Sequence, residues 1–151
     1  MDTLDIERGV ARPGRDYQTA ADGHAAEPQA GNLGLERLID EMHDFNGRSS
    51  WLASRAKARK TLEGLVFDSE IAAPNAPVMR GTMVVGRTFG SVYSPSLRRA
   101  IALAQLDASA MAPGARLFVV LPTSADAPFE RRANAEIVDL PFLASPDPIL
   151  P

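Results

Sequence analysis

Residues that interrupt regular structure divide this chain into short segments. Twelve prolines and eleven glycines are spread over 151 residues, and proline cannot donate a hydrogen bond within a sheet. Runs of bulky and β-branched side chains between them predict strands over residues 62–67, 78–88, 116–121 and 134–140. Gly81 and Gly86 indicate a hairpin turn or a bulge in the second strand region. Short strands separated by turns favour a small antiparallel β-barrel, so the expected fold class is mainly β with short helices.

Three helices are expected beside these strands. Apolar residues at helical spacing predict a surface helix over residues 33–43, and a second helix is expected over residues 51–60. The third is expected over residues 95–106, because Ser94 is a good N-cap and Pro95 suits the first helical position. The preceding Gly90-Ser91 pair is interpreted as a turn.

Both ends of the chain are expected to lie outside the barrel. Residues 1–31 are rich in charged residues, Gly, Ala and Pro and have no sustained hydrophobic period, which predicts a flexible leader. An extended arm that lies on a partner is the alternative. The prolines of residues 145–151 predict a loose tail. The barrel domain is therefore expected to cover residues 32–144.

Composition excludes several classes of function. The chain has no cysteine, which rules out disulfides, thiol catalysis and thiolate metal sites. A net charge of -3 gives no reason to expect a nucleic-acid partner or an anionic membrane. We recognise neither a secretory signal nor an apolar run of about eighteen residues, and we expect a cytoplasmic location.

No catalytic or metal-binding residue is predicted. The two histidines, His24 and His43, have neither a carboxylate–hydroxyl pattern nor a metal-ligand pattern around them. Ser94 does not lie in a nucleophile elbow, and helix capping explains its position. The glycines form no phosphate-binding loop, and the dispersed carboxylates are expected on a solvated surface.

Four short blocks, in order along the chain, are similar to one known family. They are Asp-Phe-Asn-Gly-Arg at 44–48, Arg-Lys-Thr-Leu-Glu-Gly-Leu at 59–65, the Gly86–Leu97 run with its Ser-Pro-x-Leu motif, and Ala-Glu-Ile-Val-Asp-Leu-Pro-Phe at 135–142. Together they resemble the C-terminal barrel domain of the glycine cleavage T-protein (aminomethyltransferase) family. That domain is also found in dimethylglycine dehydrogenase and sarcosine oxidase. The resemblance implies the same small barrel.

The resemblance also implies a part in tetrahydrofolate-dependent chemistry. Members of this family pass a one-carbon group to tetrahydrofolate and use two preceding folate-binding domains, for which 151 residues leave no room. We therefore expect a small subunit that docks on a larger folate-binding subunit and completes a methyl or one-carbon transfer (demethylase) enzyme. It is expected to be inactive alone, with tetrahydrofolate bound mainly by the partner. The alternatives are a non-catalytic scaffold subunit of a multi-subunit flavin-dependent amine oxidase or demethylase, and an autonomous binding protein for a folate-like ligand.

Two groups of residues are candidate sites. Arg87 and Tyr93 flank the expected glycine turn and are the predicted cofactor-binding residues, because a guanidinium can hold folate carboxylates and a phenol can stack and donate a hydrogen bond. The alternatives are an ion pair or solvent exposure for Arg87, and packing under the turn for Tyr93. Trp51 with Arg48 and Arg55 is the predicted partner interface, since aromatic rings flanked by arginine are typical of interfaces. A core position for the ring is the alternative.

Overall fold

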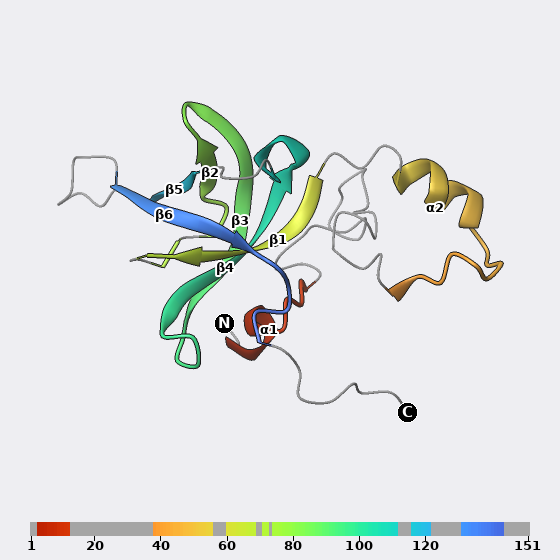
Figure 1. The fold of residues 1–151 in the computed structure, drawn as a ribbon, viewed down its shortest axis with the longest axis horizontal. Helices are drawn as coiled ribbons and strands as arrows, with labels where there is room; N and C mark the ends of the chain where they lie inside the picture. The colour runs from red at the N-terminus through yellow and green to blue at the C-terminus, as the bar shows by residue number, and fades with distance from the viewer. Residues whose placement is uncertain are drawn as a thin grey trace.

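Six antiparallel strands make up most of the structure, a computed structural model that describes residues 3–12, 38–55, 60–68, 71–72, 74–111, 116–121 and 131–143. The strands are β1 (Lys60–Phe67), β2 (Pro77–Arg80), β3 (Met83–Ser94), β4 (Arg99–Asp107), β5 (Leu117–Leu121) and β6 (Arg131–Val138). They close into a barrel in the order β1-β4-β3-β2-β5-β6 (Figure 1). The predicted fold class, a small antiparallel barrel with short helices, is confirmed.

Alternating side chains fill the inside of the barrel. On β4, every second residue from Ala100 to Leu106 points inward and is at most 3% exposed. The other strands contribute larger side chains to this interior cluster, among them Leu65, Phe67, Val78, Val85, Leu117, Val119 and Leu121. The interior of so small a barrel is narrow, so the small alanines of β4 leave room for Phe67 and the leucines.

A second apolar cluster lies outside the barrel wall, on the face formed by β1, β4 and β3. Its buried members are Ile6, Leu62, Ile101 and Leu103. Ile6 belongs to the short helix α1 (Thr3–Glu7), which lies next to the barrel in Figure 1. Leu140 and Phe142 pack against the same cluster from the other end of the chain. Segments from both ends of the sequence therefore cover one face of the barrel together.

The packing of α1 differs from the flexible leader predicted for residues 1–31. Ile6 is fully buried and Glu7 is 5% exposed, and the Phe142 amide donates a 3.0 Å hydrogen bond to the Glu7 carbonyl. A helix of five residues is too short to show a hydrophobic period, and tertiary contacts hold it in place. The rest of the predicted leader and the predicted tail, residues 145–151, lie outside the described residues. The domain limits, 32–144, stay a prediction.

The helix predicted over residues 95–106 is wrong, because this segment forms a hairpin turn and strand β4. The Ser94 hydroxyl does accept a hydrogen bond from the Leu97 amide, at 3.2 Å, as an N-cap would. The chain then turns back at Arg98, whose φ is 53°. A run of Ala, Ile and Leu fits a helical period and a strand period equally well, and pairing with β1 and β3 selects the strand.

Other predicted elements agree with the structure to different degrees. The helix predicted over 51–60 corresponds in part to α2 (Arg48–Arg55), and η4 (Ala108–Met111) is a short 3-10 helix. The described part of the helix predicted over 33–43, residues 38–43, is not an α-helix. A turn at Gly81, with φ 61°, joins β2 to β3, and a bulge adjoins Gly86. The Gly90-Ser91 turn is wrong, since both residues lie within β3.

None of the helices among the described residues combines the length and the apolar character needed to cross a bilayer.

Candidate functional site

The two predicted cofactor-binding residues lie on β3 but on opposite sides of the barrel wall. Arg87 is paired with Gln105, and Tyr93 with Ala100. Directly paired residues share a face of a sheet, and Ala100 belongs to the interior cluster. Arg87 is therefore on the outer face and exposed. Tyr93 is on the inner side, at the end of the barrel, and is 50% exposed.

A bulge in β3 is the cause of this separation. Residues six apart on a regular strand point the same way. The register shifts between Thr88 and Gly90, so one extra residue is accommodated between Arg87 and Tyr93. The two side chains then point to opposite faces of the barrel wall. Their part in cofactor binding stays a prediction.

Buried hydroxyl groups on the inner face of β3 hold the segment that precedes β2. Thr88 is fully buried, and its Oγ1 accepts a 3.0 Å hydrogen bond from the Ala76 amide. Ser91 Oγ accepts a 3.2 Å hydrogen bond from the Ala72 amide. These contacts fix residues that lie against the barrel interior, since Ala72 and Ala76 belong to its cluster. Sequence reasoning missed them, although polar residues on the inward face of a strand are a detectable signal.

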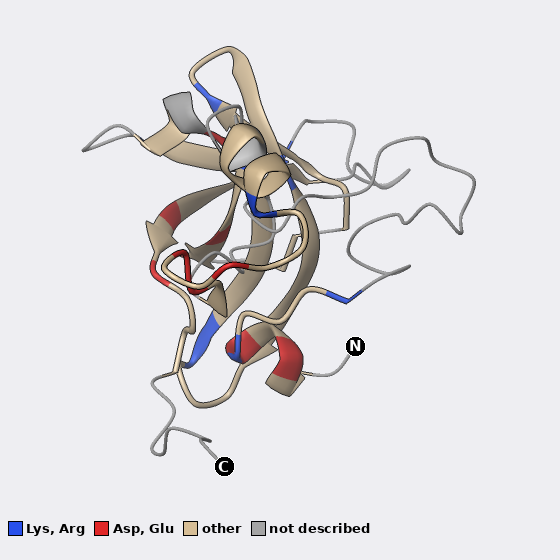
Figure 2. Cartoon of the chain, turned by 90° about the vertical axis from the view of Figure 1, so that its right-hand side faces the viewer, with Lys and Arg blue, Asp and Glu red and all other residues tan. Residues whose placement is uncertain are grey.

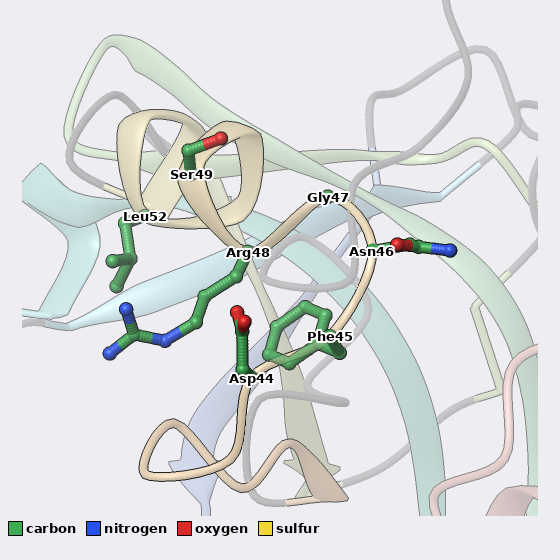
Figure 3. A pocket seen from close by; sticks show the side chains of 7 residues that line it. All are labelled: Asp44, Phe45, Asn46, Gly47, Arg48, Ser49 and Leu52. Carbon is green, nitrogen blue, oxygen red and sulfur yellow. The ribbon is translucent and has the colours of Figure 1, made fainter.

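The three predicted interface residues, Arg48, Trp51 and Arg55, all belong to α2. The Asp44–Gly47 loop, with Arg48, Ser49 and Leu52, lines an open depression of about 640 Å³ (Figure 3). The Arg48 side chain is directed back along its own chain, since Nε and Nη2 donate hydrogen bonds of 3.1 and 3.0 Å to the Glu41 carbonyl. Leu52 is 39% exposed at the rim.

Trp51 does not present the exposed ring on which the interface prediction depends. Its side chain is only 8% exposed, so the alternative of a buried ring describes it better. The backbone of Arg55 ends α2, and its side chain lies outside what the structure describes. Of the predicted interface residues, the structure therefore leaves Arg48 partly exposed and buries Trp51.

The loop before α2 also contains Asp40, a carboxyl group whose pKa is lowered. His43 Nδ1 lies 2.9 Å from Asp40 Oδ2, and the Met42 amide donates a 2.9 Å hydrogen bond to Asp40 Oδ1. Both hydrogen bonds favour the charged carboxylate, with the His43 contact the larger cause, and lower the pKa of Asp40 below its usual 3.8. Within the described ranges, no three His, Asp or Glu side chains gather as metal ligands do. His24 lies outside those ranges.

A buried polar contact joins α1 to the β3–β4 hairpin, and sequence reasoning missed it. The Ser94 hydroxyl donates a 2.5 Å hydrogen bond to Glu7 Oε1, across 87 positions of sequence. Ser94 is fully buried and Glu7 nearly so. Close by, Arg12 forms a 2.6 Å ion pair with Asp5, which is 9% exposed. No local pattern links such distant residues, so the sequence carried no signal for this contact.

Comparisons with known proteins agree with this architecture. The family model described as the glycine cleavage T-protein C-terminal barrel domain matches residues 60–143, more than half of the chain. Aminomethyltransferase from Streptomyces avermitilis is 30% identical over 146 residues, covering 93% of this chain and 36% of that protein. Aminomethyltransferase from Streptomyces coelicolor is 31% identical with the same coverage.

A solved structure shares the fold. The glycine cleavage system aminomethyltransferase T from Bartonella henselae superimposes with a TM-score of 0.68 at 18% identity, covering 94% of this chain and 37% of that one. The chain therefore spans about a third of the length of the relatives that it matches. With its closed six-stranded barrel and its match over residues 60–143, the chain belongs to the glycine cleavage T-protein C-terminal barrel domain family.

Proposed function

We propose that this chain is the barrel component of a tetrahydrofolate-dependent one-carbon transfer enzyme. In this proposal it docks on a larger partner subunit that carries folate-binding domains. The observation that supports it is the extent of the match: almost the whole chain aligns with about a third of two aminomethyltransferases. A barrel that corresponds to one part of such enzymes is best explained as one part of a similar assembly. We expect that assembly to act in the cytoplasm.

The proposed contribution of the barrel is to close a site whose folate contacts are supplied mainly by the partner. A closed barrel with a filled interior is a rigid body, and its outer surface can exclude water from a neighbouring site. Holding the reactants in a fixed orientation lowers the entropic part of the barrier. The opposite orientations of Arg87 and Tyr93 support this division of roles, because they do not form one folate pocket on this chain.

Reconstitution tests the proposal. The tagged full chain is purified from its host, co-eluting subunits are identified by mass spectrometry, and methyl-group or methylene-group transfer to tetrahydrofolate is assayed with and without the partner. We expect a larger subunit with a folate-binding domain, and turnover only with both subunits present. Turnover by this chain alone, or a monodisperse chain with no partner, would contradict the proposal.

A non-catalytic scaffold in a flavin-dependent amine oxidase or demethylase is the second candidate. The same separation of Arg87 and Tyr93 favours it, since neither side chain is then required for folate. In the assembled complex, Arg87→Gln and Tyr93→Phe are each compared with the unmodified chain for folate affinity. Unchanged affinity in both variants, in a complex that contains flavin, would favour the scaffold. Weaker folate binding in either variant would place that side chain at the folate site and contradict the scaffold.

A further inference from the structure

Three exposed arginines lie near the contact between α1 and the β3–β4 hairpin. Arg8 follows Glu7, whose carboxylate accepts the Ser94 hydrogen bond. Arg99 is the strand partner of Ser94, and Arg98 precedes it in the turn. All three side chains are exposed. Figure 2 shows basic segments near the acidic helix α1 at the end of the molecule where the hairpin lies. We call Arg8, Arg98 and Arg99 the arginine surface.

The guanidinium groups of the arginine surface make no hydrogen bond or ion pair to other described residues. Two carboxylates near the arginine surface already have hydrogen-bond or ion-pair partners. Glu7 is buried under Ser94, and Asp5 pairs with Arg12. Asp139, beside the Leu140 that packs against Gly9, is exposed. The arginine surface is thus locally basic on a chain whose net charge is -3.

The backbone of Arg98 provides a second, independent observation. Its φ of 53° lies in the left-handed region, which costs energy for any residue with a Cβ and which glycine adopts freely. The β3–β4 turn requires this conformation, and glycine would adopt it at lower cost. An exposed arginine at this position, with no ion pair to the described residues, therefore adds charge to the surface at some cost to the fold.

From these observations we propose that the arginine surface is a docking surface for an acidic segment of a protein partner. Resting on the proposed function, we assign that segment to the subunit with folate-binding domains. Opposite charges steer association and set the register of two proteins, and arginine forms bidentate hydrogen bonds with carboxylates. Glu7 and Ser94 hold the helix end and the turn together, so the three guanidinium groups are presented as one surface.

The test compares two double variants of the full chain that remove the same charge. Arg98→Gly with Arg99→Gln removes two arginines from the surface. The control, Lys60→Gln with Arg116→Gln, removes two exposed cations elsewhere. Lys60 is the strand partner of Asp107, at the far end of β4 from Arg99. Arg116 precedes β5, which is separated from β4 by β3 and β2. The probe is a fluorescein-labelled oligoglutamate peptide, and its affinity is measured by anisotropy at low and at raised salt.

We expect the Arg98→Gly/Arg99→Gln chain to bind the probe about tenfold more weakly, with a smaller dependence on salt. The control should lose much less, and Arg8→Gln alone should show an intermediate loss. Equal losses in the two double variants, or unchanged binding in both, would overturn the proposal. The thermal midpoint must not fall in Arg98→Gly, because the turn gains a residue suited to its φ. A lower midpoint would contradict the argument from backbone strain.

A second measurement separates this inference from the proposed function. The same variants are tested for retention of the co-purified partner at rising salt. A partner that is retained equally by the surface variant and the control overturns the inference alone. When no partner is recovered, the proposed function fails, and the oligoglutamate comparison still decides whether the surface binds acidic segments.

Discussion

At the scale of single residues, the contact between Ser94 and Glu7 is the one on which the packing of α1 depends most. We expect Ser94→Ala to lower the free energy of unfolding by about 1–3 kcal/mol, because a buried carboxylate and the Leu97 amide both lose a partner. Urea unfolding followed by circular dichroism measures the change. Ser96→Ala, at an exposed position of the same turn, is the control and should stay within about 0.5 kcal/mol of the unmodified chain.

A similar loss in both serine variants would mean that the turn, and not the buried hydrogen bond, is sensitive to substitution. A loss confined to Ser94→Ala would identify the contact with Glu7 as the stabilising feature. Glu7→Gln then serves as a further comparison, since the amide oxygen can still accept the Ser94 hydrogen bond without a buried charge.

Asp40 has a pKa below its usual value, and its dependence on His43 can be measured directly. A carboxyl whose folded pKa is lowered stabilises the folded state above its unfolded pKa. That contribution is lost as the pH falls through the folded pKa. We expect His43→Gln to raise the pKa of Asp40 toward 3.8, because the larger cause of the shift is removed. Carbon NMR of the Asp40 carboxyl across the acid range measures it, and an unchanged pKa would assign the shift to the Met42 amide.

The orientation of Arg87 and Tyr93 shows where residue-level prediction from sequence ends. Both side chains flank the same glycine, and their even spacing predicts a shared face of a strand. The bulge between Thr88 and Gly90 reverses that expectation. Bulges depend on the register of both neighbouring strands, which no local pattern contains. For Trp51, the basic neighbours indicated a surface position, whereas the residue is only 8% exposed, because burial depends on tertiary packing that the local sequence does not contain.

At the scale of elements, the strands that lie between turn residues could be predicted from the sequence, and β4 could not. The segments 62–67 and 116–121 are flanked by proline, glycine or polar residues, and both form strands. The segment 95–106 carried a good N-cap and an apolar run that suited a helix, and Ser94 does make the capping contact. Pairing on both sides with β1 and β3 outweighs that local preference. Helix α1 was missed because five residues give no period.

The close approach of β3 and β4 depends on Gly86. A Cβ at this position would collide with the Gln105 carbonyl oxygen and would lie 2.6 Å from Leu106 Cδ2. We expect Gly86→Ala to lower the free energy of unfolding by about 3 kcal/mol, because backbone cannot move aside as a flexible side chain can. Gly81→Ala is the control: its Cβ meets nothing within 4 Å, and its φ of 61° costs about 1 kcal/mol. Equal losses in urea unfolding would show that the two strands can separate at Gly86.

At the scale of the whole molecule, the two ends of the described chain are joined across one face of the barrel. Ile6 and Phe142 pack in the same outer cluster, and the Phe142 amide bonds to the Glu7 carbonyl at 3.0 Å. Truncating two residues of one cluster changes the free energy of unfolding non-additively, whereas the effects of truncating two distant residues are additive. The outer cluster should therefore behave as one unit that is separate from the barrel interior.

A double-mutant cycle tests this coupling. Ile6→Ala alone should cost about 2–5 kcal/mol, and its combination with Phe142→Ala should deviate from the sum of the single losses by at least about 0.5 kcal/mol. The matched cycle pairs Ile6→Ala with Val119→Ala, which lies in the interior cluster and should add within about 0.5 kcal/mol. Leu4→Ala, at a position that is 56% exposed on the same helix, controls for disturbance of α1 itself. Additivity in both cycles would mean that the two chain ends bind the barrel independently, and that α1 can leave its face without loosening residues 140–143.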